Sequence, residues 1–224
     1  MPNRSIQLGI VVIAAIIFAT IYYMQQPHSP ASPMQSTQTE QHRTDAFENN
    51  PPPENLNPHL SLSAPIENAD NRINKKPFAI KIDPKTSPVQ PERFSGYHTG
   101  TDFETTPEEA TTEVKIFALC DGKLLQKRTA SGYGGVMIQS CKINDEDVTI
   151  VYGHINITSV SLTVGQDIKA GDQIAILGNQ GPATDNERKH LHVGIHKGTS
   201  VNIKGYVQSQ FELNQWIDYK SLHI

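Results

Sequence analysis

The chain has 224 residues, a formal net charge of −4 at pH 7, two cysteines and nine histidines. This charge excludes the basic domain that is typical of nucleic-acid-binding proteins, so no nucleic-acid partner is expected. Two cysteines exclude a disulfide-dense scaffold and a four-cysteine zinc site, but they leave room for one disulfide. Hydrophobic residues make up only 37% of the chain, which indicates that part of it lies outside a packed core.

The first apolar segment covers residues 6–24, IQLGIVVIAAIIFATIYYM. Its length is close to the roughly 20 residues that a helix needs to cross a bilayer. Arg4 precedes it, and Tyr22 and Tyr23 end it as interfacial residues would. We therefore predict a transmembrane anchor at 1–24 that holds the protein in a membrane, with the rest of the chain exported. The alternative is a cleaved signal peptide, whose apolar region is shorter and ends in small residues.

Residues 25–76 are rich in Pro, Asn and Gln and contain no glycine. Such a composition buries too little apolar surface to offset the entropy lost on ordering, so it predicts a disordered linker. A propeptide that covers the active site is the alternative for this segment.

The composition becomes typical of β-structure from residue 77 onward. Short apolar runs alternate with Gly, Asp and Asn turn signals, which predicts an all-β domain with an antiparallel barrel-like or sandwich-like arrangement over 77–205. The expected strands are 78–82, 114–119, 122–128, 135–143, 147–155, 159–164, 173–178 and 190–196. The final segment, 206–224, is expected to form one short helix that packs through Phe211, Leu213 and Trp216.

The two cysteines lie on either side of a predicted hairpin that joins strands 114–128 and 134–143. Its tip falls between Ala130 and Ser131, so antiparallel pairing places Cys120 opposite Cys141. Facing residues lie within the distance that a disulfide can bridge, and an exported domain meets an oxidising compartment. We predict a Cys120–Cys141 disulfide; two buried free thiols are the alternative.

Three histidine motifs occur in the predicted β domain. His98 and Asp102 lie four residues apart and can converge on one ion if the backbone bends at Gly100. His190 and His192 project from the same face of a strand because side chains alternate, and His196 shares that parity. A third motif, Val-Tyr-Gly-His, ends a strand at 151–154. Spacing alone does not decide which histidines bind a metal.

The order and spacing of these motifs resemble the lysostaphin/LytM-type zinc endopeptidases. The motifs are His98-x-Gly-x-Asp102, Tyr152-Gly-His154 and His190-x-His192. The resemblance extends over about 94–203 and includes the segments FALCDG (117–122), YGGV (133–136) and VGQDIKAGD (164–172).

The resemblance implies a role for each motif residue. His98, Asp102 and His192 would bind one Zn²⁺, and His154 and His190 would line the cleft as catalytic residues. Either of these two could be the general base. The implied activity is that of a zinc metalloendopeptidase that hydrolyses peptide bonds in peptidoglycan cross-links. Alternatives are a catalytically silent, wall-binding regulator of other hydrolases and a protease that acts on proteins.

One loop departs from the family pattern. Many members carry Gly-Pro directly before the His-x-His pair, whereas here Gly181-Pro182 comes earlier and 184–189 intervenes. Arg188 and Lys189 in this loop could pair with carboxylates of a peptide substrate. The alternative is that both residues are charges on a loop exposed to solvent.

Overall fold

The computed structural model describes residues 61–224. The predicted anchor, 1–24, and most of the predicted linker lie outside the described residues. Within the described part, no helix has both the length and the apolar character needed to cross a membrane.

The described chain is built mainly of short β-strands. They are β1 (Lys81–Ile82), β2 (Gly96–His98), β3 (Gly100–Glu104), β4 (Lys115–Phe117), β5 (Gly122–Ala130), β6 (Gly134–Ile143), β7 (Glu146–Gly153), β8 (Asp167–Ile168), β9 (Gln173–Ile176), β10 (His190–Lys197), β11 (Tyr206–Val207) and β12 (Trp216–Ile217). Helix α2 (Gln210–Leu213) is a single turn, and 3₁₀ turns occur at Ala69–Arg72, Pro107–Ala110, Ile157–Ser159, Pro182–Thr184 and Tyr219–Leu222.

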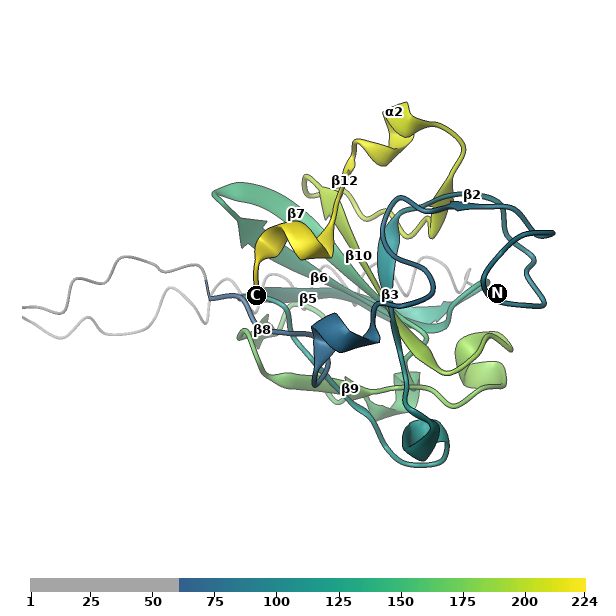
Figure 1. Ribbon diagram of the computed structural model, residues 1–224. Helices are drawn as coiled ribbons and strands as arrows, with labels where there is room; N and C mark the ends of the chain where they lie inside the picture. The colour runs from purple at the N-terminus through teal and green to yellow at the C-terminus, as the bar shows by residue number, and fades with distance from the viewer. Residues whose placement is uncertain (1–60) are drawn as a thin grey trace, which may run out of the picture. The chain divides into compact units, whose positions relative to one another are not determined.

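All strand pairs are antiparallel, as predicted. The main sheet has the order β12-β10-β7-β6-β5-β8, and β3 also pairs with β10 (Figure 1). Two smaller sheets, β1-β2-β11 and β4-β9, complete the fold. The barrel alternative is wrong for residues 61–224, where the strands form open sheets and no closed barrel. The segment 159–164 is also not a strand, because a 3₁₀ turn and a loop occupy it.

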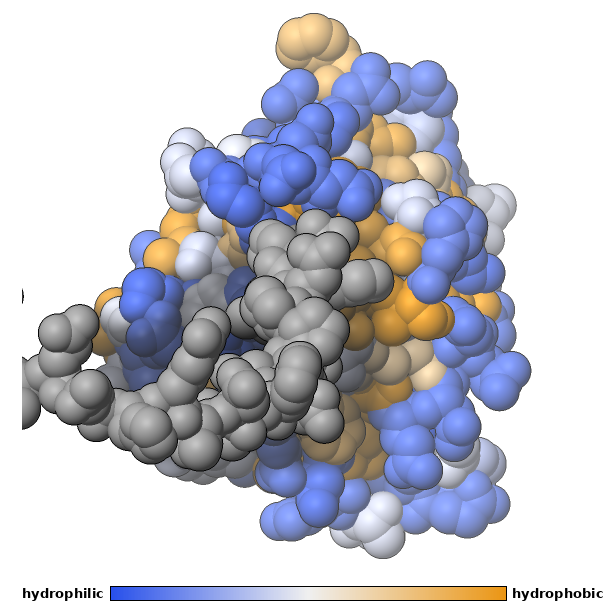
Figure 2. Space-filling view, turned by 90° about the vertical axis from the view of Figure 1, so that its left-hand side faces the viewer, coloured by the Kyte–Doolittle hydropathy of each residue, from blue (hydrophilic) through white to orange (hydrophobic). Residues whose placement is uncertain are grey.

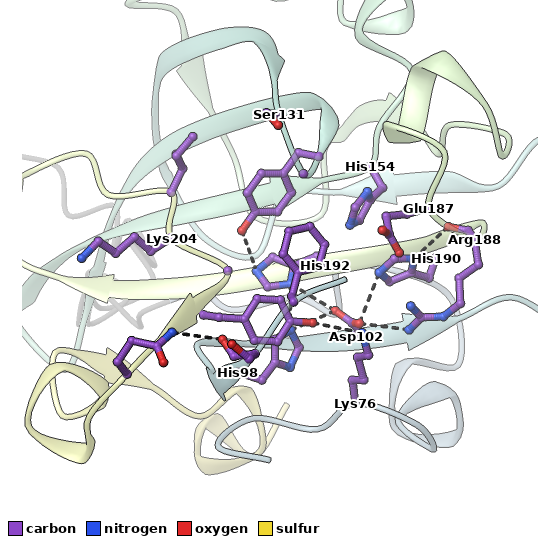
Figure 3. A pocket seen from close by; sticks show the side chains of 18 residues that line it. Lys76, His98, Asp102, Ser131, His154, Glu187, Arg188, His190, His192 and Lys204 are labelled. Atoms are coloured by element: carbon purple, nitrogen blue, oxygen red, sulfur yellow. Dashed lines mark hydrogen bonds and ion pairs between the residues drawn. The ribbon is translucent and has the colours of Figure 1, made fainter. Parts of the chain in front are cut away.

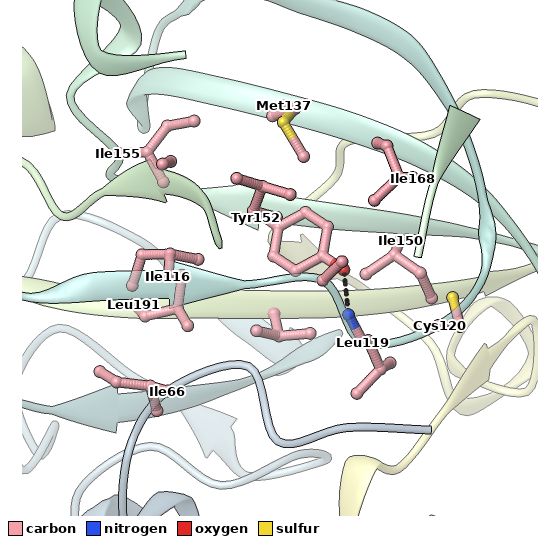
Figure 4. Close-up of a cluster of buried hydrophobic side chains, with 14 of the residues drawn as sticks. Ile66, Ile116, Leu119, Cys120, Met137, Ile150, Tyr152, Ile155, Ile168 and Leu191 are labelled. Atoms are coloured by element: carbon pink, nitrogen blue, oxygen red, sulfur yellow. Dashed lines mark hydrogen bonds between the residues drawn. The ribbon is translucent and has the colours of Figure 1, made fainter. Parts of the chain in front are cut away.

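The main sheet buries side chains on both faces. Along β6, Met137 and Cys141 face the large core, whereas Val136 and Ile138 face a smaller apolar cluster. This alternation follows from the period-2 geometry of a strand. Tyr152 lies inside the large core, where the Leu119 amide donates to its hydroxyl oxygen at 2.8 Å (Figure 4).

The surface is mainly polar on the face drawn in Figure 2, with hydrophobic side chains visible between the hydrophilic ones. The large hydrophobic residues that remain exposed include Phe211, at 79% relative exposure. Our prediction for the C-terminal segment is therefore wrong in part. Its helix has only four residues, and Leu213 and Trp216 are buried but Phe211 is not. The segment also contributes two strands, β11 in the sheet β1-β2-β11 and β12 at the edge of the main sheet.

The predicted domain boundary at residue 77 is also wrong. Leu62 forms a β-bridge with Cys120, and Ile66 is fully buried in the large core. Arg72 donates to both carboxylate oxygens of Glu109, at 2.6 and 2.8 Å. In the sequence, Ile66 and Arg72 stand among mainly polar residues, and for this reason we assigned them to the linker from composition.

We expect a fragment 77–224 to be much less stable than a fragment 61–224. The shorter fragment loses the buried Ile66 side chain, worth about 1.5–3 kcal/mol. It also loses Lys76, the partner of the buried Glu92 carboxylate, and an uncompensated buried charge costs about 3–5 kcal/mol. Thermal unfolding of both fragments should differ in Tm by on the order of 10 °C or more. Equal Tm values would show that 61–76 does not contribute to the fold.

The predicted disulfide is confirmed, because Cys120 and Cys141 are bonded. The predicted strand pairing around it is shifted, since Cys141 faces Gly122 and a register irregularity occurs between Leu124 and Gln126. The segment 115–117 also leaves the hairpin and pairs with β9. Cys120 lies two residues before Gly122, the residue that faces Cys141, and this brings the two cysteines to a Cα–Cα distance of 6.1 Å.

The double variant Cys120→Ala/Cys141→Ala should be less stable by about 3 kcal/mol, because the bond closes a loop of 21 residues. This corresponds to a Tm lower by roughly 10 °C for a domain of this size. The comparison is between the oxidised protein and the variant, with the reduced wild type as control. A variant as stable as the oxidised protein would contradict the expectation.

Candidate metal and catalytic site

Three strands bring His98, Asp102 and His192 together. Asp102 on β3 faces His192 on β10 in the antiparallel register. His98 ends β2, which continues through one residue into β3. Figure 3 shows the three side chains pointing toward one another.

The absence of a side chain at Gly100 leaves room for the His192 ring. A Cβ at residue 100 would lie 2.6 Å from the His192 imidazole, closer than atoms can approach. We predicted that this glycine allows a backbone bend, but Gly100 lies within β3 and its function is to leave space.

The donor atoms of the three residues form a nearly equilateral triangle. His98 Nε2 lies 3.1 Å from His192 Nδ1 and 3.3 Å from Asp102 Oδ1, and the last two atoms are 3.1 Å apart. Tetrahedral zinc with bonds of about 2.0–2.1 Å separates its ligand atoms by about 3.3–3.4 Å. All three residues are at most 3% exposed. Two imidazoles and a carboxylate in this arrangement fit a zinc ion.

The remaining ring nitrogens of the two histidines lie near oxygen atoms to which they can donate. His98 Nδ1 lies 3.2 Å from the carbonyl oxygen of Pro77, to which it can donate. His192 Nε2 lies 3.3 Å from the hydroxyl oxygen of Tyr133. The lone pairs of His98 Nε2 and His192 Nδ1 are then free for a metal, as in many protein metal sites.

His190 and His154 lie beside this cluster (Figure 3). Their ring centroids are 4.2 Å apart. His190 Nδ1 donates to the carbonyl oxygen of Arg188 at 2.9 Å, and its Nε2 lies 3.2 Å from Asp102 Oδ2. His154 directly follows β7 and has a φ of 61°, a left-handed conformation that is unfavourable for a residue with a Cβ. Such strain is typical of functional positions.

His196 shares the strand parity of His190 and His192 but lies away from the cluster. Its ring packs on Trp216 with a centroid distance of 4.8 Å. Although its parity matches theirs, His196 is therefore not part of the candidate metal site.

Burial determines the protonation of the site. It lowers the pKa of His192 to about 4 and, together with His190, holds the pKa of His154 well below its ordinary value. Burial alone would raise the pKa of Asp102, but the nearby charges of His190 and His98 hold it well below its usual range. These shifts keep His192 and His154 neutral and Asp102 ionised, the protonation states in which imidazole and carboxylate bind a metal.

The predicted role of Arg188 and Lys189 is wrong, as is the alternative of solvated charges. Arg188 donates to Asp102 Oδ2 at 3.0 Å and to both oxygens of the buried Glu104 carboxylate. Lys189 donates to the carbonyl oxygens of Glu109 and Thr112. Arg188 thus holds the carboxylate oxygen of Asp102 that faces away from the ligand triangle.

A cleft of about 420 Å³ that is open to solvent is lined by the three candidate ligands, the two neighbouring histidines and Arg188. Its other walls come from Lys76, Phe94, Ser131, Gly132, Tyr133, Glu187, Ile203, Lys204 and Tyr206, among others. The size is typical of ligand sites.

Sequence reasoning missed several residues of the cleft. Tyr133 belongs to the YGGV segment of the resemblance, so a signal was present for it. Lys76 and Tyr206 approach the site from segments that we assigned to the linker and to a terminal helix, and neither carries a local motif.

The sequence model of peptidase family M23 matches residues 96–203. Comparison with curated protein sequences gives no match. Among solved structures, the chain is similar to the catalytic domain of the antimicrobial peptidase lysostaphin from Staphylococcus simulans, with 16% identity, a TM-score of 0.49, and coverage of 72% of this chain and 97% of that one.

Two other solved structures are similar at comparable levels. LytU has 23% identity and a TM-score of 0.45, with 67% of this chain and 82% of that chain covered. A zinc-containing peptidase from Vibrio cholerae has 21% identity and a TM-score of 0.43, with 70% and 38% covered. The matched residues include the three candidate ligands and both cleft histidines, and residues 96–203 of the chain belong to peptidase family M23.

Proposed function

We propose that this protein is a zinc metalloendopeptidase that hydrolyses peptide bonds in peptidoglycan cross-links. One observation carries the proposal: three buried donor atoms lie at the spacing of a tetrahedral zinc site, at the wall of a cleft that also holds two further histidines. Three protein ligands leave a fourth position open, which is the pattern of catalytic rather than structural zinc.

When bound, zinc lowers the pKa of a coordinated water toward 7 and polarises the scissile carbonyl group. His190 and His154 are the groups placed to take the proton of the attacking water and to return it to the leaving amine. Arg188 orients His190 through its carbonyl oxygen and holds Asp102 through its guanidinium group.

Peptidoglycan is the proposed substrate because it is the usual substrate of the family that the motifs resemble. We also propose that residues 1–24 anchor the protein in the cytoplasmic membrane with the domain on the periplasmic or extracellular side. The apolar run 6–24 and its flanking Arg4 support this proposal. An anchor would keep the enzyme close to a substrate that is a fixed mesh.

Incubation of the protein with purified sacculi, followed by mass spectrometry of the soluble products, tests this function. We expect cleaved cross-link peptides from the wild type and none from the His192→Ala variant. Binding to sacculi without cleavage would favour a regulator, and digestion of casein without digestion of sacculi would favour a protease that acts on proteins. Either outcome would contradict the proposal.

A further inference from the structure

The chain between β10 and β12 leaves the main sheet and brings Tyr206 to the cleft. Its strand β11 pairs with β2, and Tyr206 lies directly opposite the proposed metal ligand His98. The two rings have a centroid distance of 5.2 Å, and Phe94 stacks on Tyr206 at 5.3 Å. Tyr206 lies outside the residues that match the family model, so nothing in that match assigns it a role.

A buried ion pair holds the hydroxyl group of Tyr206. The Lys76 ammonium donates to the Tyr206 hydroxyl oxygen at 3.0 Å and also pairs with Glu92. The side chains of Lys76 and Glu92 are 2% and 1% exposed. Glu92 is fixed in turn, because the Phe94 amide and the Ser87 hydroxyl both donate to it at 2.9 Å. Burying two charges is costly, which makes a purely stabilising role a weak explanation for the pair.

Lys76 is also tied to the metal-binding residues through its backbone. Its carbonyl oxygen accepts a hydrogen bond from the Asp102 amide at 3.0 Å. Both Lys76 and Tyr206 line the cleft together with His98 and Asp102. The hydroxyl group of Tyr206 is thus held in a fixed position relative to the proposed ligands.

The contacts of the Tyr206 hydroxyl group leave its proton available for donation. A tyrosine hydroxyl has one proton to donate, and here its oxygen already accepts from Lys76. Among residues 61–224, the hydrogen bonds of Tyr206 include no acceptor for that proton. Glu92 offsets the charge of Lys76, so the ammonium acts on Tyr206 as a hydrogen-bond donor. The phenol is therefore left with a free donor at the cleft wall beside the ligand cluster.

We propose that Tyr206 is a further catalytic residue, which donates a hydrogen bond to the scissile carbonyl oxygen as negative charge develops on it, and that Lys76 positions this hydroxyl. The proposal rests on the proposed peptidase function. The phenol keeps its proton throughout, so no bond to Tyr206 forms or breaks. A preorganised donor of this kind stabilises the transition state more than the ground state.

The Tyr206→Phe variant separates this role from packing, because phenylalanine keeps the ring against His98 and Phe94. With the full-chain protein in detergent and a cross-linked muropeptide as substrate, we expect kcat to fall about 10²–10³-fold with KM nearly unchanged. Zinc content and Tm should match the wild type. Tyr97→Phe is the matched control: Tyr97 is on the same strand as His98, adjacent to it, and its ring contacts Lys81. This control should keep the wild-type kcat.

The positioning role of Lys76 requires a second comparison. Lys76→Met alone would leave the buried Glu92 carboxylate without a charged partner, so the variant to use is Lys76→Met/Glu92→Gln. It should lower kcat in the wild-type background and cause no further loss when combined with Tyr206→Phe. An unchanged kcat for Tyr206→Phe, or a fall that parallels lost zinc, would overturn the proposal. If the wild type itself cleaves no muropeptide, the proposed function fails first and this inference fails with it.

Discussion

Replacing His192 with alanine is expected to abolish cleavage and to weaken zinc binding by a factor on the order of 10²–10³. The binding free energy of zinc in four-ligand protein sites is about 10–16 kcal/mol, so one ligand contributes roughly 3 kcal/mol. The remaining pair, His98 and Asp102, cannot complete the triangle of donor atoms whose sides are 3.1–3.3 Å. Zinc content after dialysis against a weak chelator and muropeptide cleavage measure the two effects.

His196→Ala is the matched control for this experiment. His196 lies on the same strand with the same parity, but its ring packs on Trp216. The variant should keep both zinc and activity, apart from a modest loss of stability. If His196→Ala loses zinc while His192→Ala keeps it, the assignment of the ligands is wrong.

The second large effect concerns His190 and His154. Alanine at either position should lower kcat by about 10²–10⁴, the usual contribution of a general acid or base. Zinc should stay bound, because neither residue belongs to the ligand triangle. This combination of retained metal and lost activity distinguishes the two cleft histidines from His98, Asp102 and His192.

The comparison of the two variants also addresses which histidine is the base. His190 donates from Nδ1 to the Arg188 carbonyl oxygen, so its Nε2 is oriented toward the site. His154 Nδ1 is buried without a hydrogen-bond partner among the described residues. The base should be the histidine whose replacement causes the larger fall in kcat. Full activity in either variant would show that the corresponding histidine has no catalytic role.

The local features of the site could be predicted from the sequence. Strand parity placed His190 and His192 on one face, with Leu191 and Val193 in the core, and the structure has this arrangement. The spacing of the cysteines predicted the disulfide even though the pairing register was shifted. Both predictions depend only on the geometry of a strand or hairpin over a short stretch of sequence, which neighbouring residues determine.

The contacts between distant segments could not be predicted. Ile66 is buried by strands that lie far along the chain, and Lys76 reaches Glu92 and Tyr206 from a segment whose composition resembles a linker. The guanidinium of Arg188 turns inward because Asp102 and Glu104 on β3 face it. A single sequence does not show which charges meet across strands, so Lys76 was assigned to the linker and Arg188 to substrate binding or to solvent.

The most direct test of the account measures zinc and cleavage on the same sample. Zinc per chain and release of cross-link peptides from sacculi are determined in the purified protein, after chelation, and after zinc is restored. The account predicts one zinc per chain, with cleavage that disappears and returns together with the metal. Cleavage that persists after zinc is removed, or one zinc per chain without any cleavage, would contradict it.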